Sequence, residues 1–144
     1  MPMNRSKYPV DWPQISLMIR QERARWRCEC TGECGTDHEA ENATLPDLLE
    51  VVAELYPTLH VAHRCLAVHN APHPITGSWV VLTVAHLCDG WCAEAAPGRR
   101  HCGTMLHLKA MCQRCHLRLD RHQHARNAAA TRAQRRLKRQ PELF

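Results

Sequence analysis

The chain has 144 residues, long enough for one domain with a modest hydrophobic core, but only 5% of its residues are aromatic. Its nine cysteines and eleven histidines are far above ordinary usage, and its net charge is +5. No apolar run resembles a signal peptide or a membrane helix, and an odd number of cysteines cannot form a complete disulfide framework. We therefore expect a cytoplasmic protein whose cysteines bind metal rather than each other.

The N-terminal half predicts two helices separated by a cysteine-rich loop. Asp11 can cap a helix over residues 12–25, Pro13 suits its first turn, and Ile15, Met18 and Ile19 form one apolar stripe. The segment RCECTGECGTDH that follows is too polar to be buried without a metal. The next segment, LPDLLEVVAELYPTL, predicts a short helix that ends before Pro57.

The second half predicts a turn, a strand and a long helix. Thr76 and Gly77 indicate a turn, and the β-branched residues after it predict a strand that ends near His86. Residues 90–103 have no regular pattern. From about Leu106 we expect helix, continuing through the Cys112–Cys115 pair to about residue 139.

Positive charge is concentrated in this last helix. Between residues 118 and 139 there are eight Arg or Lys side chains and one acid, whereas the segment 36–54 is acidic. A basic segment of this kind indicates binding to the phosphate backbone of a nucleic acid, although a solvated helix is an equally simple interpretation. The arginines that we expect to contact DNA are Arg114, Arg118, Arg121, Arg126, Arg132, Arg135 and Arg136.

Cysteine spacing predicts a structural zinc site. Cys112 and Cys115 form a C-x-x-C pair, and Cys34 is followed by a glycine, as in the second half of a zinc knuckle. We expect a tetrahedral site formed by Cys30, Cys34, Cys112 and Cys115, with Cys28 and Cys65 as alternatives. Such a site would join the N-terminal loop to the C-terminal helix and contribute directly to folding. A second small metal site is suggested by Cys88, Cys92, His101 and Cys102, with incidental cysteines on a surface loop as the alternative.

A strand ending in histidine (VVLTVAHL), a loop and a helix with LKAMCQRCH resemble the HNH endonuclease family. The match is closest to small phage and prophage members and covers roughly residues 26–124, with an insertion between Cys34 and Cys65. The resemblance implies a small zinc-stapled α+β domain of the ββα-metal, treble-clef-like fold, spanning residues 1–144. Its parts would be the N-terminal helix at about 12–25, an insertion at about 35–64, the ββα core at about 66–124 and the basic helix to about 139.

The resemblance also implies an activity and its residues. His86 falls on the general base that activates water against a phosphodiester, and His116 on a ligand of the catalytic divalent metal, Mg²⁺ or a similar ion. The expected substrate is DNA in a bacterial cytoplasm, bound mainly through its backbone.

Two departures from the family pattern leave an alternative open. His107 stands where the family has Asn, and Ala85 stands where it often has a metal-binding Asp or His. Asp89, His107 or Asp120 could supply the missing ligand. If none does, the chain is a non-catalytic zinc protein that binds nucleic acid or a protein partner, the latter through the insertion at 35–64.

Overall fold

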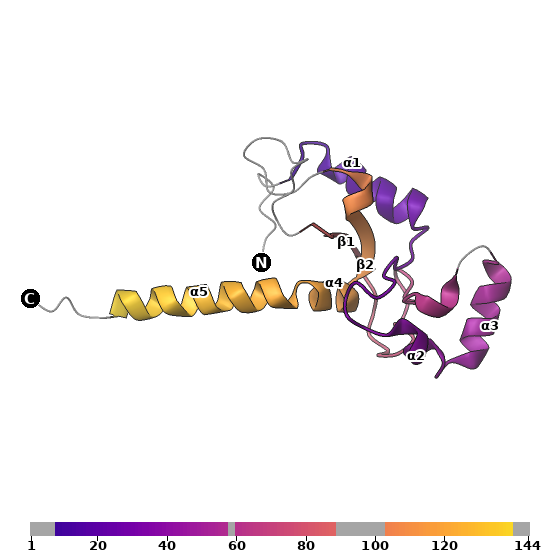
Figure 1. Ribbon diagram of the computed structural model, residues 1–144. Helices are drawn as coiled ribbons and strands as arrows, with labels where there is room; N and C mark the ends of the chain where they lie inside the picture. The colour runs from indigo at the N-terminus through magenta and orange to yellow at the C-terminus, as the bar shows by residue number, and fades with distance from the viewer. Residues whose placement is uncertain (1–7, 58–59, 89–102, 140–144) are drawn as a thin grey trace, which may run out of the picture.

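The computed structural model describes residues 8–57, 60–88 and 103–139. Within these residues, strand β1 (Leu82–His86) pairs antiparallel with strand β2 (Leu108–Cys112) near the centre of the molecule. Helix α4 (Gln113–Leu119) follows β2 directly, and helix α5 (Arg121–Arg139) projects away from the body (Figure 1). The described chain is therefore of the α+β class, as predicted, and β1, β2 and α4 form a ββα unit.

The N-terminal helix packs on one side of this hairpin. Helix α1 (Trp12–Met18) continues as the π-helical segment η2 (Ile19–Arg23), which matches the predicted range closely. Pro13 lies in the first turn as expected, but the side chain of Asp11 makes no capping hydrogen bond. Two of the three residues of the predicted apolar stripe pack on the hairpin: Ile19 is buried and Ile15 is partly buried, whereas Met18 is exposed. The core on this side is formed by Trp12, Ile19, Ala24, Val84, Leu108 and Ala110.

The prediction that helix begins near Leu106 was wrong for residues 108–112. Lys, Met, Ala and Leu favour helix in isolation, but here a short 3-10 turn, η4 (Met105–His107), leads into β2. The backbone of β1 needs a hydrogen-bonding partner, and β2 satisfies it from the Leu82–Cys112 pair to the His86–Leu108 pair. Tertiary pairing therefore overrides local propensity.

The cysteine-rich loop covers the other edge of β2. The amide of Glu29 donates to the carbonyl of Ala110, and the amide of Ala110 donates to the carboxylate of Glu29, at 2.7 and 2.8 Å. The guanidinium of Arg23 binds the same carboxylate and the carbonyl of Leu108. These contacts hold Cys28 and Cys30 beside the start of α4.

Within its described residues, 35–57 and 60–64, the insertion contains three short helical elements: α2 (His38–Asn42), α3 (Pro46–Leu55) and the 3-10 turn η3 (Val61–His63). The buried amide of Asn42 donates to the carbonyls of Val61, Ala62 and Arg64 and so joins α2 to the segment before Cys65. Helix α3 ends before Pro57, as predicted, and none of its residues is buried. In Figure 1, α2 and α3 lie toward the α4 end of the hairpin, and α1 lies toward the other end.

The predicted turn before β1 is confirmed. Pro72 and Trp79 form an isolated antiparallel bridge, and the amide of Gly77 donates to the carbonyl of His73. Gly77 has φ +68°, a conformation that favours glycine. This turn places His73 next to the cysteines.

Candidate metal centre and candidate active site

Six cysteines and one histidine lie close together around the start of α4. They form two groups, which are Cys30, Cys34, His38 and Cys115, and Cys28, Cys65, Cys112 and Cys115. All ligand atoms within a group lie within 4.8 Å of one another, and every one of these side chains is buried. Sulfur and imidazole donors in sets of four are the ligands that structural zinc prefers, so either group could hold a zinc ion.

The geometry of the first group centres on His38. Its Nε2 lies 3.4 Å from the Sγ of Cys30 and 3.7 Å from the Sγ atoms of Cys34 and Cys115. Ligands of a tetrahedral zinc ion with usual bond lengths would stand about 3.5 Å apart for a sulfur and a nitrogen. The hydrogen bond with Cys115 lowers the pKa of Cys30 to about 4, so that Cys30 is a thiolate at neutral pH.

Helix α2 sets the orientation of His38. The Asp37 carboxylate caps this helix by accepting from the amide of Ala40. The Nδ1 of His38 faces the Glu41 carboxylate at 3.4 Å, and Arg114 binds both oxygens of that carboxylate. A carboxylate on the far nitrogen is the usual support for a histidine that binds metal through the other one.

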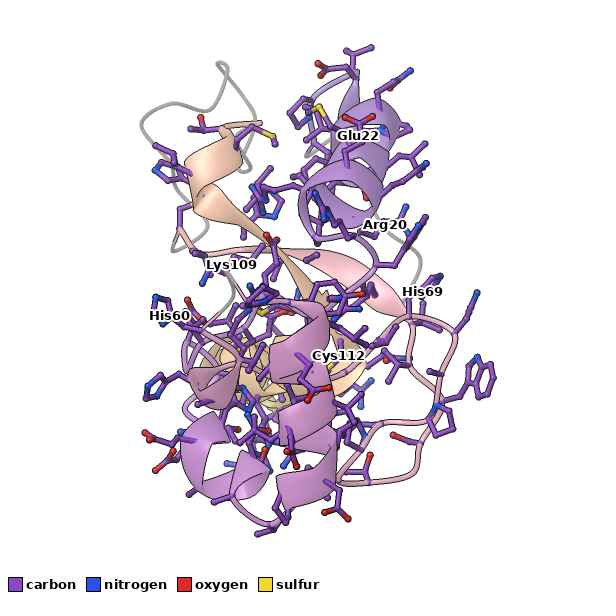
Figure 2. The ribbon with its side chains drawn as sticks, turned by 90° about the vertical axis from the view of Figure 1, so that its right-hand side faces the viewer. Arg20, Glu22, His60, His69, Lys109 and Cys112 are labelled. Atoms are coloured by element: carbon purple, nitrogen blue, oxygen red, sulfur yellow. The ribbon has the colours of Figure 1, made fainter. Side chains whose placement is uncertain are left out.

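The second group surrounds the N-terminus of α4. The Sγ atoms of Cys65 and Cys112 are 3.9 Å apart. The amide of Cys112 donates to the Sγ of Cys28 at 3.3 Å, and the amide of Cys115 donates to the Sγ of Cys112 at 3.5 Å. Amides at a helix N-terminus stabilise thiolates, the form of cysteine that binds zinc. Figure 2 shows Cys112 inside the molecule, away from Arg20 and Glu22 on the N-terminal helical segment.

The two groups divide the predicted cysteines differently from the sequence analysis. Cys30, Cys34 and Cys115 are together, but Cys112 stands with Cys28 and Cys65, which we had named as alternatives. Sequence reasoning gave His38 no role, although its position four residues after Cys34 was an available signal. Of the second proposed site, Cys88 is half-buried and outside both groups, and the other three residues lie outside the described part of the chain.

His116 lies on α4 in a defined environment. Its Nδ1 is 2.6 Å from the hydroxyl of Thr83 on β1, and its Nε2 is 3.3 Å from the carboxylate of Asp120, one helical turn later. Burial lowers the pKa of His116, although the charge of Asp120 opposes this effect. A lowered pKa favours the neutral ring, which is the form of histidine that binds a metal.

His86 ends β1 beneath aromatic side chains. Its ring stacks on Trp12, with centroids 4.9 Å apart and planes at 19°, and lies 5.7 Å from the ring of Tyr8. Side chains alternate along a strand, so Thr83 and His86 leave β1 on opposite sides. Ala85 is fully buried.

Tyr8 connects the surroundings of the two histidines. Burial raises its pKa, and the negative charge of nearby Asp120 adds to the rise. His107 lies in η4, where its carbonyl accepts from the amide of Leu87 at 2.8 Å. Asp89, the third predicted ligand, lies outside the described residues.

The arginines predicted to contact DNA fall into two sets. Arg114 binds Glu41, and Arg118 donates to the hydroxyl of Thr36, so these two serve the fold. The other set lies along α5, where the exposed side chains are Arg121, Arg132, Arg135 and Arg136. Arg126 is also in α5, but its side chain is outside the described part.

Among the described residues, no helix has the length and apolar character needed to span a membrane. No family model matches the chain, and neither characterised proteins nor solved structures gave a match.

Proposed function

We propose that this protein is a metal-dependent endonuclease of the HNH type that hydrolyses DNA phosphodiester bonds. The observation that carries the proposal is the pair formed by His116 on α4 and Asp120 directly after this helix, in which Thr83 anchors His116 to β1 within a ββα unit. Strand and helix hold these donors more firmly than loops would. The resemblance noted above assigns His116 a role of this kind.

The donors on α4 fit a catalytic divalent ion. The Nε2 of His116 lies 3.3 Å from a carboxylate oxygen of Asp120, and both side chains are partly exposed. A divalent ion bound between these two atoms would replace the proton that they share without it. Two ligands on one side leave other coordination positions for water and phosphate oxygens, as is usual for Mg²⁺ in nucleotide chemistry. When bound, the ion supplies charge stabilisation for the phosphate and the leaving oxygen.

His86 is the proposed general base. An imidazole accepts a proton from water near neutral pH, provided that its ring is held in position. Stacking on Trp12 provides that position, and the partly exposed ring remains open to solvent. His107 at the start of β2 is the candidate for orienting the base or the metal, in place of the family asparagine.

Helix α5 is the proposed DNA contact. Its exposed arginines would bind phosphates, and phosphate contacts carry no sequence information. Binding should weaken steeply as salt concentration rises, since each phosphate contact releases a counterion.

A plasmid cleavage assay tests the proposal. Zinc-loaded protein should nick or cleave supercoiled DNA when Mg²⁺ or Mn²⁺ is added, and His86→Ala and His116→Ala should each lose about 10²- to 10⁴-fold in rate. His60→Ala is the matched control, because His60 is exposed, belongs to neither metal-ligand group and lies at the edge of the molecule in Figure 2. Full activity in both active-site variants would refute the assignment.

A second candidate function is a non-catalytic binding module. Helix α3 exposes Leu48, Val51 and Leu55, which recur at the spacing of one helix face, and this surface would suit a protein partner. The aromatic cover on His86 and the absence of a ligand at Ala85 favour the same interpretation. If the protein is such a module, no divalent metal should support DNA cleavage, and the affinity for DNA should be unchanged in His86→Ala.

A further inference from the structure

Cys115 belongs to both metal-ligand groups. The first group contributes three other ligands, Cys30, Cys34 and His38, and the second contributes Cys28, Cys65 and Cys112. Two tetrahedral ions need eight coordination bonds, whereas the two groups together have seven residues. The numbers agree if one residue binds both ions, and a thiolate can do so because its sulfur has more than one lone pair.

Distances between donor atoms support two separate ions. In the first group the three distances from His38 to sulfur are 3.4, 3.7 and 3.7 Å. In the second group the Cys65 and Cys112 sulfurs are 3.9 Å apart, and sulfurs on one tetrahedral zinc would be about 3.8 Å apart. Each group therefore has the spacing of its own metal ion.

A second buried histidine, His73, is the alternative candidate for the eighth coordination bond, in place of a bridging sulfur. Its Nε2 lies 3.8 Å from the sulfur of Cys65, and the side chain is as buried as that of His38. Its Nδ1, however, accepts a hydrogen bond from the amide of Ile75 at 3.1 Å. A ring nitrogen that accepts carries no proton, so the ring is neutral and its single proton lies on Nε2, which then has no lone pair free for a metal.

His38 has the opposite arrangement. Its Nδ1 faces the carboxylate of Glu41, which can only accept, so Nδ1 carries the proton and Nε2 has a free lone pair. That lone pair points toward three sulfurs. His38 is thus suited to coordinate, and His73 to donate an N–H to a thiolate of the second group.

We propose that the protein holds a binuclear zinc centre in which the thiolate of Cys115 bridges two ions, one completed by Cys30, Cys34 and His38 and the other by Cys28, Cys65 and Cys112. His73 is a positioning residue that donates to the sulfurs of the second ion. The six thiolates carry a charge of −6 and the two Zn²⁺ ions a charge of +4, so the centre has a net charge of −2. The N–H of His73, directed at the sulfur of Cys65, partly offsets this excess at the second ion.

Cadmium substitution tests the centre in the wild-type protein, independently of nuclease activity. Native mass spectrometry should show two zinc ions per chain. The ¹¹³Cd-loaded protein should give two resonances split by ¹¹³Cd–¹¹³Cd coupling through the shared sulfur, and one of them should couple to the ¹⁵N-labelled Nε2 of His38. One ion per chain, or two resonances without mutual coupling, would overturn the proposal.

The two buried histidines provide matched variants. His73→Ala should retain two zinc ions, whereas His38→Ala should retain one after mild chelation. If His38→Ala does not fold, the ¹¹³Cd–¹⁵N coupling in the wild-type protein decides between the histidines. Coupling to His73 instead of His38, or loss of one ion in His73→Ala alone, would contradict the assignment.

Discussion

The two sides of the β1–β2 hairpin are stabilised in different ways. On the side that we call the cysteine side, six of the eleven buried core residues are cysteines, close enough for their thiolates to repel. On the other side, the helix side, Trp12, Ile19 and their neighbours form an ordinary apolar core with η2 and α1. We therefore expect the cysteine side to depend on a bound metal for its stability, and the helix side to depend on apolar packing. The proposed active site uses both, because His86 belongs to the helix side and His116 to α4.

The largest expected effect is that of zinc removal. A strong zinc chelator should abolish cooperative thermal unfolding, because structural zinc contributes on the order of 10–16 kcal/mol in small zinc domains. Near-UV circular dichroism and calorimetry, followed together with zinc content, measure the loss. The Cys88→Ser variant is the control, since Cys88 is outside both groups, and it should retain zinc and stability. A zinc-free protein with an unchanged transition would refute the division between the two sides.

Truncation of Trp12 should have the next largest effect. Trp12 is 7% exposed and packs on both the hairpin and His86, so Trp12→Ala should lower the free energy of unfolding by about 3–5 kcal/mol. Urea denaturation of the zinc-loaded protein measures this change, and zinc content should stay the same. Trp79→Ala, at a side chain that is 62% exposed, should cost at most about 0.5 kcal/mol. Zinc loss in Trp12→Ala would show that the two sides are not independent.

The smallest expected effect concerns Thr83, which joins β1 to His116 on α4. Thr83→Val removes the hydroxyl that contacts Nδ1 of His116, and should weaken Mn²⁺ binding and DNA cleavage by about 10- to 100-fold while stability changes little. Thr83→Ser retains the hydroxyl and should keep most of the activity. Calorimetric Mn²⁺ titration and the plasmid assay measure both variants. Equal losses in Val and Ser variants would mean that the hydroxyl does not position His116.

Several elements could be predicted because their signals are local. The apolar stripe from Ile15 to Ile19, the turn at Gly77 and the helix before Pro57 all depend on residues within a few positions of one another. Local reasoning failed at β2, where residues with high helix propensity form a strand because β1 is beside them. It also missed His38, whose spacing from Cys34 was visible but whose orientation depends on Glu41 and Arg114.

The sequence by itself determined the chemistry that is available: an excess of soft ligands, a basic C-terminal helix and histidines at the end of a strand and after a cysteine pair. Only the tertiary structure decided how these residues are grouped. Cys28, Cys65 and Cys112 are separated by tens of residues, and nothing in their spacing predicts that they share Cys115 with a second group. The same holds for Thr83 and His116, which meet because the hairpin places β1 beside α4. Ligand type is a property of single residues, whereas coordination requires distances that only the folded chain defines.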